Sequence, residues 1–248
     1  MCRHLAYVGE PVGLADLLLT PPHSLLRQSW APCDMRGGGT VNADGYGIGW
    51  YTGDPEPVRL RRAAPMWTDA ALPGLAASVT SGAVLAAVRS ATVGMPVVET
   101  ACAPFTSGPW LFSHNGVVRE WPSSVAALAA RLPVTDLLLM DAPTDSALLW
   151  LLVRALLADG VPPGKAVGSV VAEVAAAAPG SRLNLLLTDG RTITGTAWTH
   201  SLWVRATPGG VVVASERADQ EDGWREVPDG HLVTATASTV EITRVGEP

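Results

Sequence analysis

The sequence is poor in lysine, in cysteine and in long apolar runs, and each shortage excludes a class of protein. Lys165 is the single lysine, and the arginines are scattered along the chain. Binding to nucleic-acid phosphates needs clustered cations, so no surface for DNA or RNA is indicated. The 17 basic and 23 acidic residues among 248 leave a net charge of −6, which also disfavours a nucleic-acid partner.

The apolar runs are too short for a membrane protein. The longest, Leu148 to Leu157, is interrupted by Arg154, whereas a spanning helix needs roughly 20 apolar residues. No apolar signal segment follows Met1. We therefore expect a cytoplasmic protein without membrane contact, formed by a single domain over residues 1–248.

The scarcity of cysteine argues against both disulfide bonds and a cysteine-ligated zinc site. Cys2, Cys33 and Cys102 are odd in number and contain no CxxC pair, so neither a disulfide framework nor a structural zinc site is indicated. We expect no metal ion and no cofactor. At least one thiol is then free, and its position becomes the main question.

The order of elements predicts an α+β fold. Alternating or continuous apolar runs predict strands first, then Ala- and Leu-rich helices, then strands joined by tight turns. A first strand is expected at 2–8, followed by a loop-rich stretch at 21–44. Further early strands are expected at 46–51, at 58–62 as its hairpin partner, at 83–89 and at 110–114, the last ending in an Asn115-Gly116 turn. Helices are expected at 69–80, 123–132, 146–158 and 164–178, the last ended by Pro179-Gly180. Late strands are expected at 183–188, 192–198, 202–206, 211–215, 232–237 and 240–244. Tight turns make strands antiparallel, and the helices need a face to cover, so a four-layer αββα sandwich of two antiparallel sheets follows.

Cys2 is the first candidate for chemistry. Initiator methionine is normally removed before a small second residue, which would place a thiol and a free α-amine on Cys2. An α-amine titrates at about 7.7–8.0, so it can accept the proton of the thiol near neutral pH. One residue would then supply nucleophile and base. The alternative is a buried cysteine acting as a small apolar side chain.

Three further positions could serve a site, and each has an ordinary alternative. Asn115 and the backbone N–H of Gly116 could donate to a developing oxyanion, or form an Asn-Gly turn. Arg89 could bind a carboxylate in a bidentate manner, or form an internal ion pair. Asp145 could hold a substrate ammonium, or cap the helix that follows it, for which Thr144 is the other candidate cap.

Together these segments resemble the class II glutamine amidotransferases, which are N-terminal-nucleophile hydrolases with an αββα sandwich. The resemblance rests on Met1-Cys2, the Arg-Ser-Ala-Thr-Val-Gly segment at 89–94, the Ser-His-Asn-Gly segment at 113–116, and Asp145. It implies a Cys2 nucleophile, an oxyanion hole of Asn115 and Gly116, and a glutamyl group held by Arg89 and Asp145. The other substrate-binding candidates in these motifs are Ser90, Thr92 and His114.

Further segments are similar to one branch of the family, the amidohydrolases of ergothioneine biosynthesis, which remove glutamate from a γ-glutamyl amide. They are Met1 to Leu5, Gln28 to Pro32, Asn42 to Gly47, Ala87 to Pro96, and Val213 to Glu216. Ser90 and Val93 stand where many amidotransferases have an aromatic residue and a histidine, which weakens the case for free glutamine as substrate. Gly38 stands where relatives often have a histidine before the Asn-Ala-Asp-Gly segment, so the resemblance implies no functional role for this position.

The resemblance implies a small γ-glutamyl substrate and no required partner protein. Two alternatives remain open, a glutaminase subunit that passes ammonia to a partner, and a non-catalytic αββα binding module. The leaving group in the branch carries a trimethylammonium, which aromatic faces attract. The tryptophans nearest the motifs are Trp30, Trp50, Trp67 and Trp110. No chemistry is assigned to His4, His23, His200 or His231.

Overall fold

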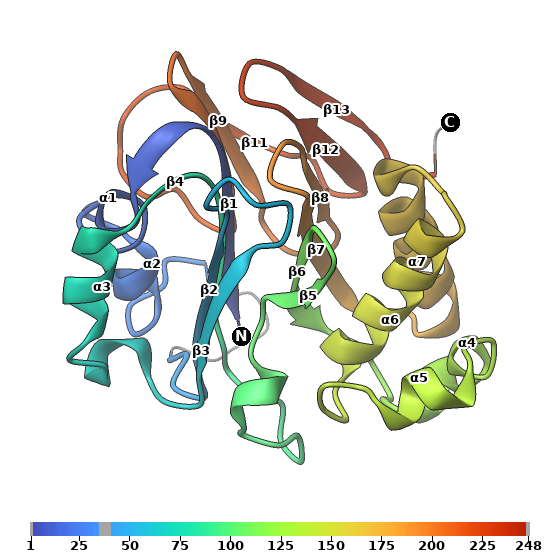
Figure 1. Ribbon diagram of the computed structural model, residues 1–248. Coiled ribbons are helices and arrows are strands. Elements are labelled where there is room, and N and C mark those ends of the chain that lie inside the picture. The colour runs from blue at the N-terminus through green and yellow to red at the C-terminus, as the bar shows by residue number, and fades with distance from the viewer. Residues whose placement is uncertain (1, 35–40, 247–248) are drawn as a thin grey trace.

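Two antiparallel sheets pack face to face, and helices cover the outer face of each (Figure 1). The structure is a computed structural model and describes residues 2–34 and 41–246. The first sheet has seven strands in the order β11-β9-β10-β1-β4-β2-β3, and the second has six in the order β13-β12-β8-β7-β6-β5. This is the predicted αββα sandwich.

The strands of the first sheet are β1 (Arg3–Gly13), β2 (Tyr46–Trp50), β3 (Val58–Arg62), β4 (Thr80–Val88), β9 (Trp203–Thr207), β10 (Gly210–Ala214) and β11 (Trp224–Glu226). Those of the second are β5 (Phe105–Ser107), β6 (Trp110–Val117), β7 (Arg182–Thr188), β8 (Ile193–Ala197), β12 (His231–Ala235) and β13 (Val240–Arg244). The amino end of β1 lies at the centre of the first sheet, between β10 and β4.

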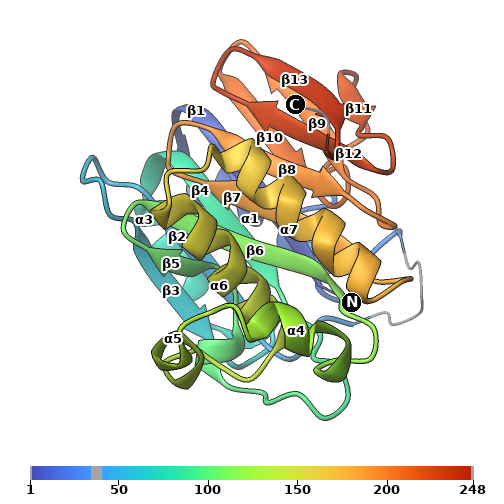
Figure 2. The same ribbon diagram turned by 90° about the vertical axis from the view of Figure 1, so that its right-hand side faces the viewer.

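The helices divide between the two outer faces. Those on the first sheet are α1 (Leu14–Leu18), α2 (Leu25–Gln28) and α3 (Leu72–Ser78). The second sheet is covered by α6 (Asp145–Ala158) and α7 (Pro163–Ala177), which lie side by side over it (Figure 2). Two shorter helices, α4 (Ala126–Ala129) and α5 (Val134–Leu138), lie near one end of α6. None of the helices in the described part of the chain is long and apolar enough to cross a membrane.

Three apolar cores follow from the alternation of side chains along each strand. In β1, Leu5 and Tyr7 pack against the helices of the first sheet, whereas Ala6 and Val8 pack between the sheets. A third core joins α6 and α7 to the second sheet. His4 and Cys2 have the same parity as Ala6, so the side chain of Cys2 belongs to the face between the sheets.

Most of the predicted elements are confirmed, but the Asn115-Gly116 turn is wrong. Both residues lie inside β6, which continues to Val117. Asn115 pairs with Asn184 and Gly116 with Leu183 of β7. The turn preference of Asn-Gly is a local tendency, and the ladder of β7 overrides it by pairing both residues.

The other differences concern short elements. The predicted helix at 123–132 is a 3₁₀ turn, Ser123–Val125, followed by α4. Ser124 donates its hydroxyl proton to the carbonyl of Arg119, which fits a turn better than a helix interior. The loop-rich stretch at 21–44 contains α2, capped by Ser24, whose hydroxyl accepts from the Arg27 N–H. The elements α1, α5, β5 and β11 were not predicted, and the glycine run 37–39 lies outside the described residues.

Candidate active site

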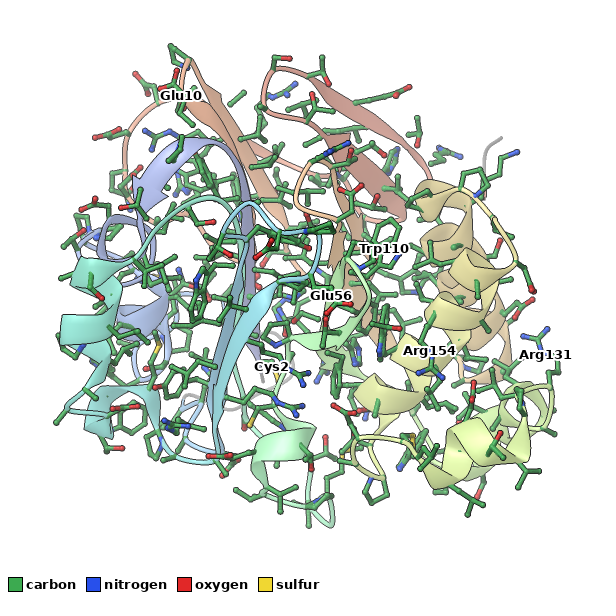
Figure 3. The ribbon with its side chains drawn as sticks, viewed as in Figure 1. Cys2, Glu10, Glu56, Trp110, Arg131 and Arg154 are labelled. Atoms are coloured by element: carbon green, nitrogen blue, oxygen red, sulfur yellow. The ribbon has the colours of Figure 1, made fainter. Side chains whose placement is uncertain are left out.

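Cys2 lies directly before β1, at the end of the sandwich where the amino end of the chain enters between the sheets (Figure 3). Its thiol is half-buried, and Sγ lies 3.8 Å from the carbonyl oxygen of Ser90. Ser90 follows β4, the neighbour of β1, so the thiol contacts the Arg-Ser-Ala-Thr-Val-Gly segment through the backbone. The structure therefore brings together two of the segments that were singled out in the sequence.

A small cavity of about 20 Å³ adjoins the thiol. Its walls come from both sheets and from the start of α6; they are Cys2, Tyr46, Ala87, Val88, Arg89, Ala101, Cys102, Ala103, Phe105, His114 and Ser146. Cys102 is fully buried, and burial raises the pKa of its thiol to about 11. Cys102 is thus a protonated wall of the cavity at neutral pH, while Cys33 is exposed elsewhere. Cys2 is therefore the thiol that precedes β1 and contacts the segment at 89–94.

Arg89 provides an unneutralised cation in this cavity. It is buried, and Nη1 donates to the carbonyl of Pro96 at 2.9 Å. No carboxylate of the described residues lies within ion-pair distance of it. Arg89 therefore forms no internal ion pair with the described residues, which was the alternative to a ligand-binding role. Its guanidinium is available to an anionic ligand.

Asp145 is a buried carboxylate whose contacts are backbone and hydroxyl groups. Oδ2 accepts from the N–H of Val118 at 2.9 Å, and Oδ1 accepts from the N–H of Ser146 at 2.7 Å. The cap of α6 is Thr144, whose hydroxyl accepts from the N–H of Ala147 at 3.2 Å. Asp145 is therefore the first helical residue and joins α6 to the end of β6, and within residues 2–34 and 41–246 no cation pairs with it.

The hydrogen bonds of His114 determine which ring nitrogen carries the proton. Nε2 lies 2.9 Å from the carbonyl oxygen of Arg182, which can only accept, so Nε2 donates. Nδ1 lies 3.0 Å from the hydroxyl oxygen of Ser146, whose proton can also reach Oδ1 of Asp145 at 3.3 Å. A Cβ on Gly116 would lie 1.9 Å from the same Arg182 oxygen, so the close approach of β7 requires glycine there.

Asn115 reaches from the second sheet to the first. Its Nδ2 lies 3.0 Å from the hydroxyl of Ser215, and its buried Oδ1 has no hydrogen-bond partner. The same hydroxyl accepts from the backbone N–H of His4 at 3.0 Å. Ser215 follows β10, so the amide is held from across the sandwich, beside the first residues of β1. Sequence reasoning missed Ser215 as part of the site, although Val213 to Glu216 was among the segments that carry the resemblance.

The remaining candidates lie in different surroundings. Thr92 is exposed and does not line the cavity. Trp50 and Trp110 are core or partly buried residues, and Figure 3 shows Trp110 well apart from Cys2. Trp30 and Trp67 are 36% and 40% exposed and form an edge-to-face pair with ring centres 5.9 Å apart.

A buried ion-pair network lies on the other side of β1. The carboxylate of Glu216 accepts from Nε of Arg3, from Nε2 of His23 at 2.6 Å and from the N–H of Cys33 at 2.8 Å. Burial by itself raises the pKa of Glu216, but the His23 hydrogen bond and the Arg3 charge outweigh it and lower the pKa to about 2. The network thus holds the side chain of Arg3, the residue next to Cys2.

Three of these side chains could also be considered as metal ligands. Ligand atoms of His23, Cys33 and Glu216 lie within 4.8 Å of one another. The fit is poor, because both oxygens of Glu216 already accept hydrogen bonds from Arg3, His23 and two backbone N–H groups.

His4 is fully buried at the start of β1, and its Nδ1 lies 3.0 Å from the Ser113 hydroxyl. Burial, and after it the charge of the neighbouring His114, holds the pKa of His4 well below its usual range.

Known proteins similar to this chain fall in one family. The model of a family described as "Glutamine amidotransferases class-II" matches residues 24–210. A protein of Mycolicibacterium smegmatis named gamma-glutamyl-hercynylcysteine sulfoxide hydrolase is 41% identical over 243 residues, which cover 98% of this chain and 99% of that protein. A protein of the same name from Mycobacterium tuberculosis is 40% identical over 245 residues, covering 98% and 96%.

Solved structures extend the likeness to the fold. A glutamine aminotransferase class-II domain protein from Silicibacter pomeroyi gives a TM-score of 0.72 at 24% identity, covering 99% of this chain and 100% of that one. The glutamine phosphoribosylpyrophosphate amidotransferase of B. subtilis gives 0.66 at 15% identity, covering 100% and 50%. At these identities the likeness concerns the sandwich alone.

Proposed function

The chain belongs to the class II glutamine amidotransferases, and we propose that it is the hydrolase that cleaves the γ-glutamyl amide bond of γ-glutamyl-hercynylcysteine sulfoxide. The products are glutamate and hercynylcysteine sulfoxide. About 40% identity along nearly the whole of two relatives with that activity in their names supports the substrate. The observation that carries the mechanism is Cys2 at the head of the central strand, beside a cation that no carboxylate of the described residues neutralises.

The two unpaired charges suit the amino-acid end of a glutamyl group. Arg89 binds the α-carboxylate, because a guanidinium offers a planar pair of donors to a carboxylate. Asp145 binds the α-ammonium, since its buried carboxylate is held by N–H groups and lacks a cation among the described residues. The δ-carbonyl then extends toward Cys2, with Ser90, Thr92 and His114 belonging to the same binding segments.

The nucleophile is the Cys2 thiol and the base is its own α-amine. Removal of Met1, which lies outside the described residues, frees that amine. The amine accepts the thiol proton, the thiolate attacks the δ-carbonyl carbon, and the resulting ammonium protonates the departing amine as the C–N bond breaks. Water then adds to the thioester carbon and gives a proton to the α-amine; collapse expels the Cys2 thiolate, which recovers that proton, and glutamate leaves.

Asn115 and Gly116 stabilise the oxyanion that forms in both attacks. Reversing the ends of the Asn115 amide lets Ser215 donate its hydroxyl proton to Oδ1, while Ser215 continues to accept from His4. Nδ2 then becomes a buried donor without a partner at the position of the unsatisfied Oδ1. A preorganised donor of this kind stabilises negative charge in the transition state.

The leaving group carries a trimethylammonium, and the exposed pair of Trp30 and Trp67 is the aromatic surface suited to it. The guanidinium of Arg27 already lies 5.6 Å from the Trp30 ring centre, so that ring attracts cations. No partner protein is needed for hydrolysis, because water is the acceptor.

The test is glutamate release from two substrates by the purified chain. We expect hydrolysis of γ-glutamyl-hercynylcysteine sulfoxide to exceed that of glutamine, measured as glutamate by mass spectrometry, and to vanish in Cys2→Ala. Ammonia release from glutamine that rises on adding a partner would favour a glutaminase subunit. Glutamate release from neither substrate, with Met1 retained, would favour a binding module.

A further inference from the structure

Arg182 opens β7 at the same end of the sandwich as Cys2. It pairs with Val117, two residues beyond the pair formed by Asn184 and Asn115. Because side chains alternate along a strand, Arg182 and Asn184 share one face, as do Val117 and Asn115. That face looks toward the first sheet, since Asn115 contacts Ser215 there. Arg182 therefore extends between the sheets, beside the proposed oxyanion hole.

The side chain of Arg182 is half-buried, and its charge is not neutralised by any carboxylate of the described residues. Nε is buried and has no hydrogen-bond partner, and none of the described carboxylates pairs with it. Arginines elsewhere in the described structure have acidic partners, as Arg61 of β3 has Asp141 at 2.8 Å and Arg154 of α6 has Asp136 at 2.8 Å. A buried charged donor without an acceptor is costly, which points to an anionic ligand.

The electrostatic neighbours of Arg182 are consistent with a place at the site. Burial and then the nearby Arg119 lower its pKa, whereas the Cys2 thiol acts in the opposite sense. The backbone of Arg182 is fixed as well, because its carbonyl accepts from His114, a wall of the cavity beside Cys2. The second sheet thus holds the backbone of Arg182 against His114, which lines the same cavity as Cys2.

The chemistry of the substrate supplies a second carboxylate next to the scissile bond. Arg89, from the first sheet, is assigned to the α-carboxylate of the glutamyl group. When the leaving amine is an α-amino acid, the scissile nitrogen is bonded to a carbon that carries a second carboxylate. That carboxylate travels with the leaving group, on the other side of the scissile bond.

We propose that Arg182 binds the α-carboxylate of the departing amino acid and so selects γ-glutamyl amides of amino acids over glutamine. The assignment rests on the proposed function and adds its specificity determinant. Glutamine releases ammonia, which offers nothing to this cation. A role in stabilising the Cys2 thiolate would, in contrast, affect all amide substrates alike.

The test compares two amides that differ in that carboxylate alone: γ-glutamyl-hercynylcysteine sulfoxide, and its analogue in which hydrogen replaces the cysteine carboxylate. In the unchanged enzyme we expect kcat/KM to be about 10–100-fold higher for the first, the worth of a hydrogen bond to a charged group. In Arg182→Gln the ratio should fall toward one. Arg182→Lys keeps the positive charge but loses the planar pair of N–H donors, so it should give an intermediate ratio.

Arg119→Gln is the matched control. Arg119 is an exposed cation close to Arg182, so its removal changes the local potential without removing the proposed contact, and the ratio should stay high. Cys2 labelling by a glutamine-like alkylating analogue, followed by intact mass, verifies that each variant retains a folded site. An unchanged ratio in Arg182→Gln, or a ratio near one in the unchanged enzyme, would overturn the assignment. Absence of glutamate from both amides would instead overturn the proposed function beneath it.

Discussion

The side-chain amide of Asn115 and the hydroxyl of Ser215 lie 3.0 Å apart, and this contact joins the two sheets next to Cys2. Both side chains are fully buried. The amide plane is therefore held from the opposite sheet, and the end of the amide that does not meet Ser215 has no hydrogen-bond partner.

Loss of this contact should lower turnover more than substrate binding. Asn115→Ala removes the proposed oxyanion donor and should reduce kcat by about 100- to 1000-fold. Ser215→Ala leaves the donor but frees its orientation, and should reduce kcat by roughly 2- to 10-fold, the worth of one neutral hydrogen bond. Steady-state kinetics with the γ-glutamyl substrate measures both. Ser113→Ala, which removes a buried hydroxyl bound to His4 instead, is the control, and equal kcat in Ser215→Ala and the unchanged enzyme would contradict the prediction.

The three thiols should differ sharply in reactivity. Only Cys2 should react with a glutamine-like alkylating analogue at pH 7–8, because burial raises the pKa of Cys102 to about 11 and Cys33 does not line the cavity. Intact mass should show one adduct on a chain lacking Met1, and peptide mapping should locate it at Cys2. Cys33→Ser should label normally, and Cys2→Ala should not label while keeping its thermal transition. An adduct on Cys102 would refute this assignment of the thiols.

Acid should destabilise the protein through Glu216. Its pKa is lowered from 4.5 to about 2 in the folded state, so its ionised form stabilises the fold above the unfolded value. That contribution is complete above about pH 5 and is lost as the pH falls toward 2. Thermal unfolding followed from pH 7 to pH 3 should show the loss, and Glu216→Gln should flatten it.

The same variant should be less stable at pH 7. Removing one partner of a buried ion pair costs about 3–5 kcal/mol, because Arg3 is left as a buried, unpaired charge. Glu173→Gln breaks the exposed pair with Arg131 and should change stability by less than about 1 kcal/mol. Equal stabilities for the two variants in denaturant titration would show that the Arg3–Glu216 pair does not anchor β1.

Gly116 should tolerate no side chain. A Cβ there would lie 1.9 Å from the Arg182 carbonyl oxygen and 2.5 Å from Nε2 of His114, both of which are held by strand pairing or hydrogen bonds. Gly116→Ala should therefore lower both the melting temperature and kcat/KM. Gly74→Ala in α3, where a Cβ meets nothing within 4 Å, should be neutral or stabilising by up to about 1 kcal/mol. Normal activity in Gly116→Ala would mean that β7 can move away without loss of the site.

Local patterns were sufficient for most of the architecture. Alternation predicted the hairpin of β2 and β3, whose residues pair in register from Tyr46 with Arg62 to Trp50 with Val58. Apolar spacing and a Thr-Asp start predicted α6, and Pro-Gly after 178 predicted the end of α7. Elements as short as β5 and β11 were missed because three residues carry too little periodicity to be distinguished from a loop.

The sequence by itself determined which residue types are available for chemistry: a cysteine at the second position, Arg89 after an apolar strand, Asn115-Gly116 and Asp145, in the order of the family. Tertiary structure decided their environment. It converted the Asn-Gly pair from a turn into part of a ladder, assigned the cap of α6 to Thr144, and brought Ser215 and Arg182 beside residues 100 and 65 positions away. The physical reason is that a hydrogen bond or an unpaired charge depends on distance in space, which strand pairing sets and a local pattern does not contain.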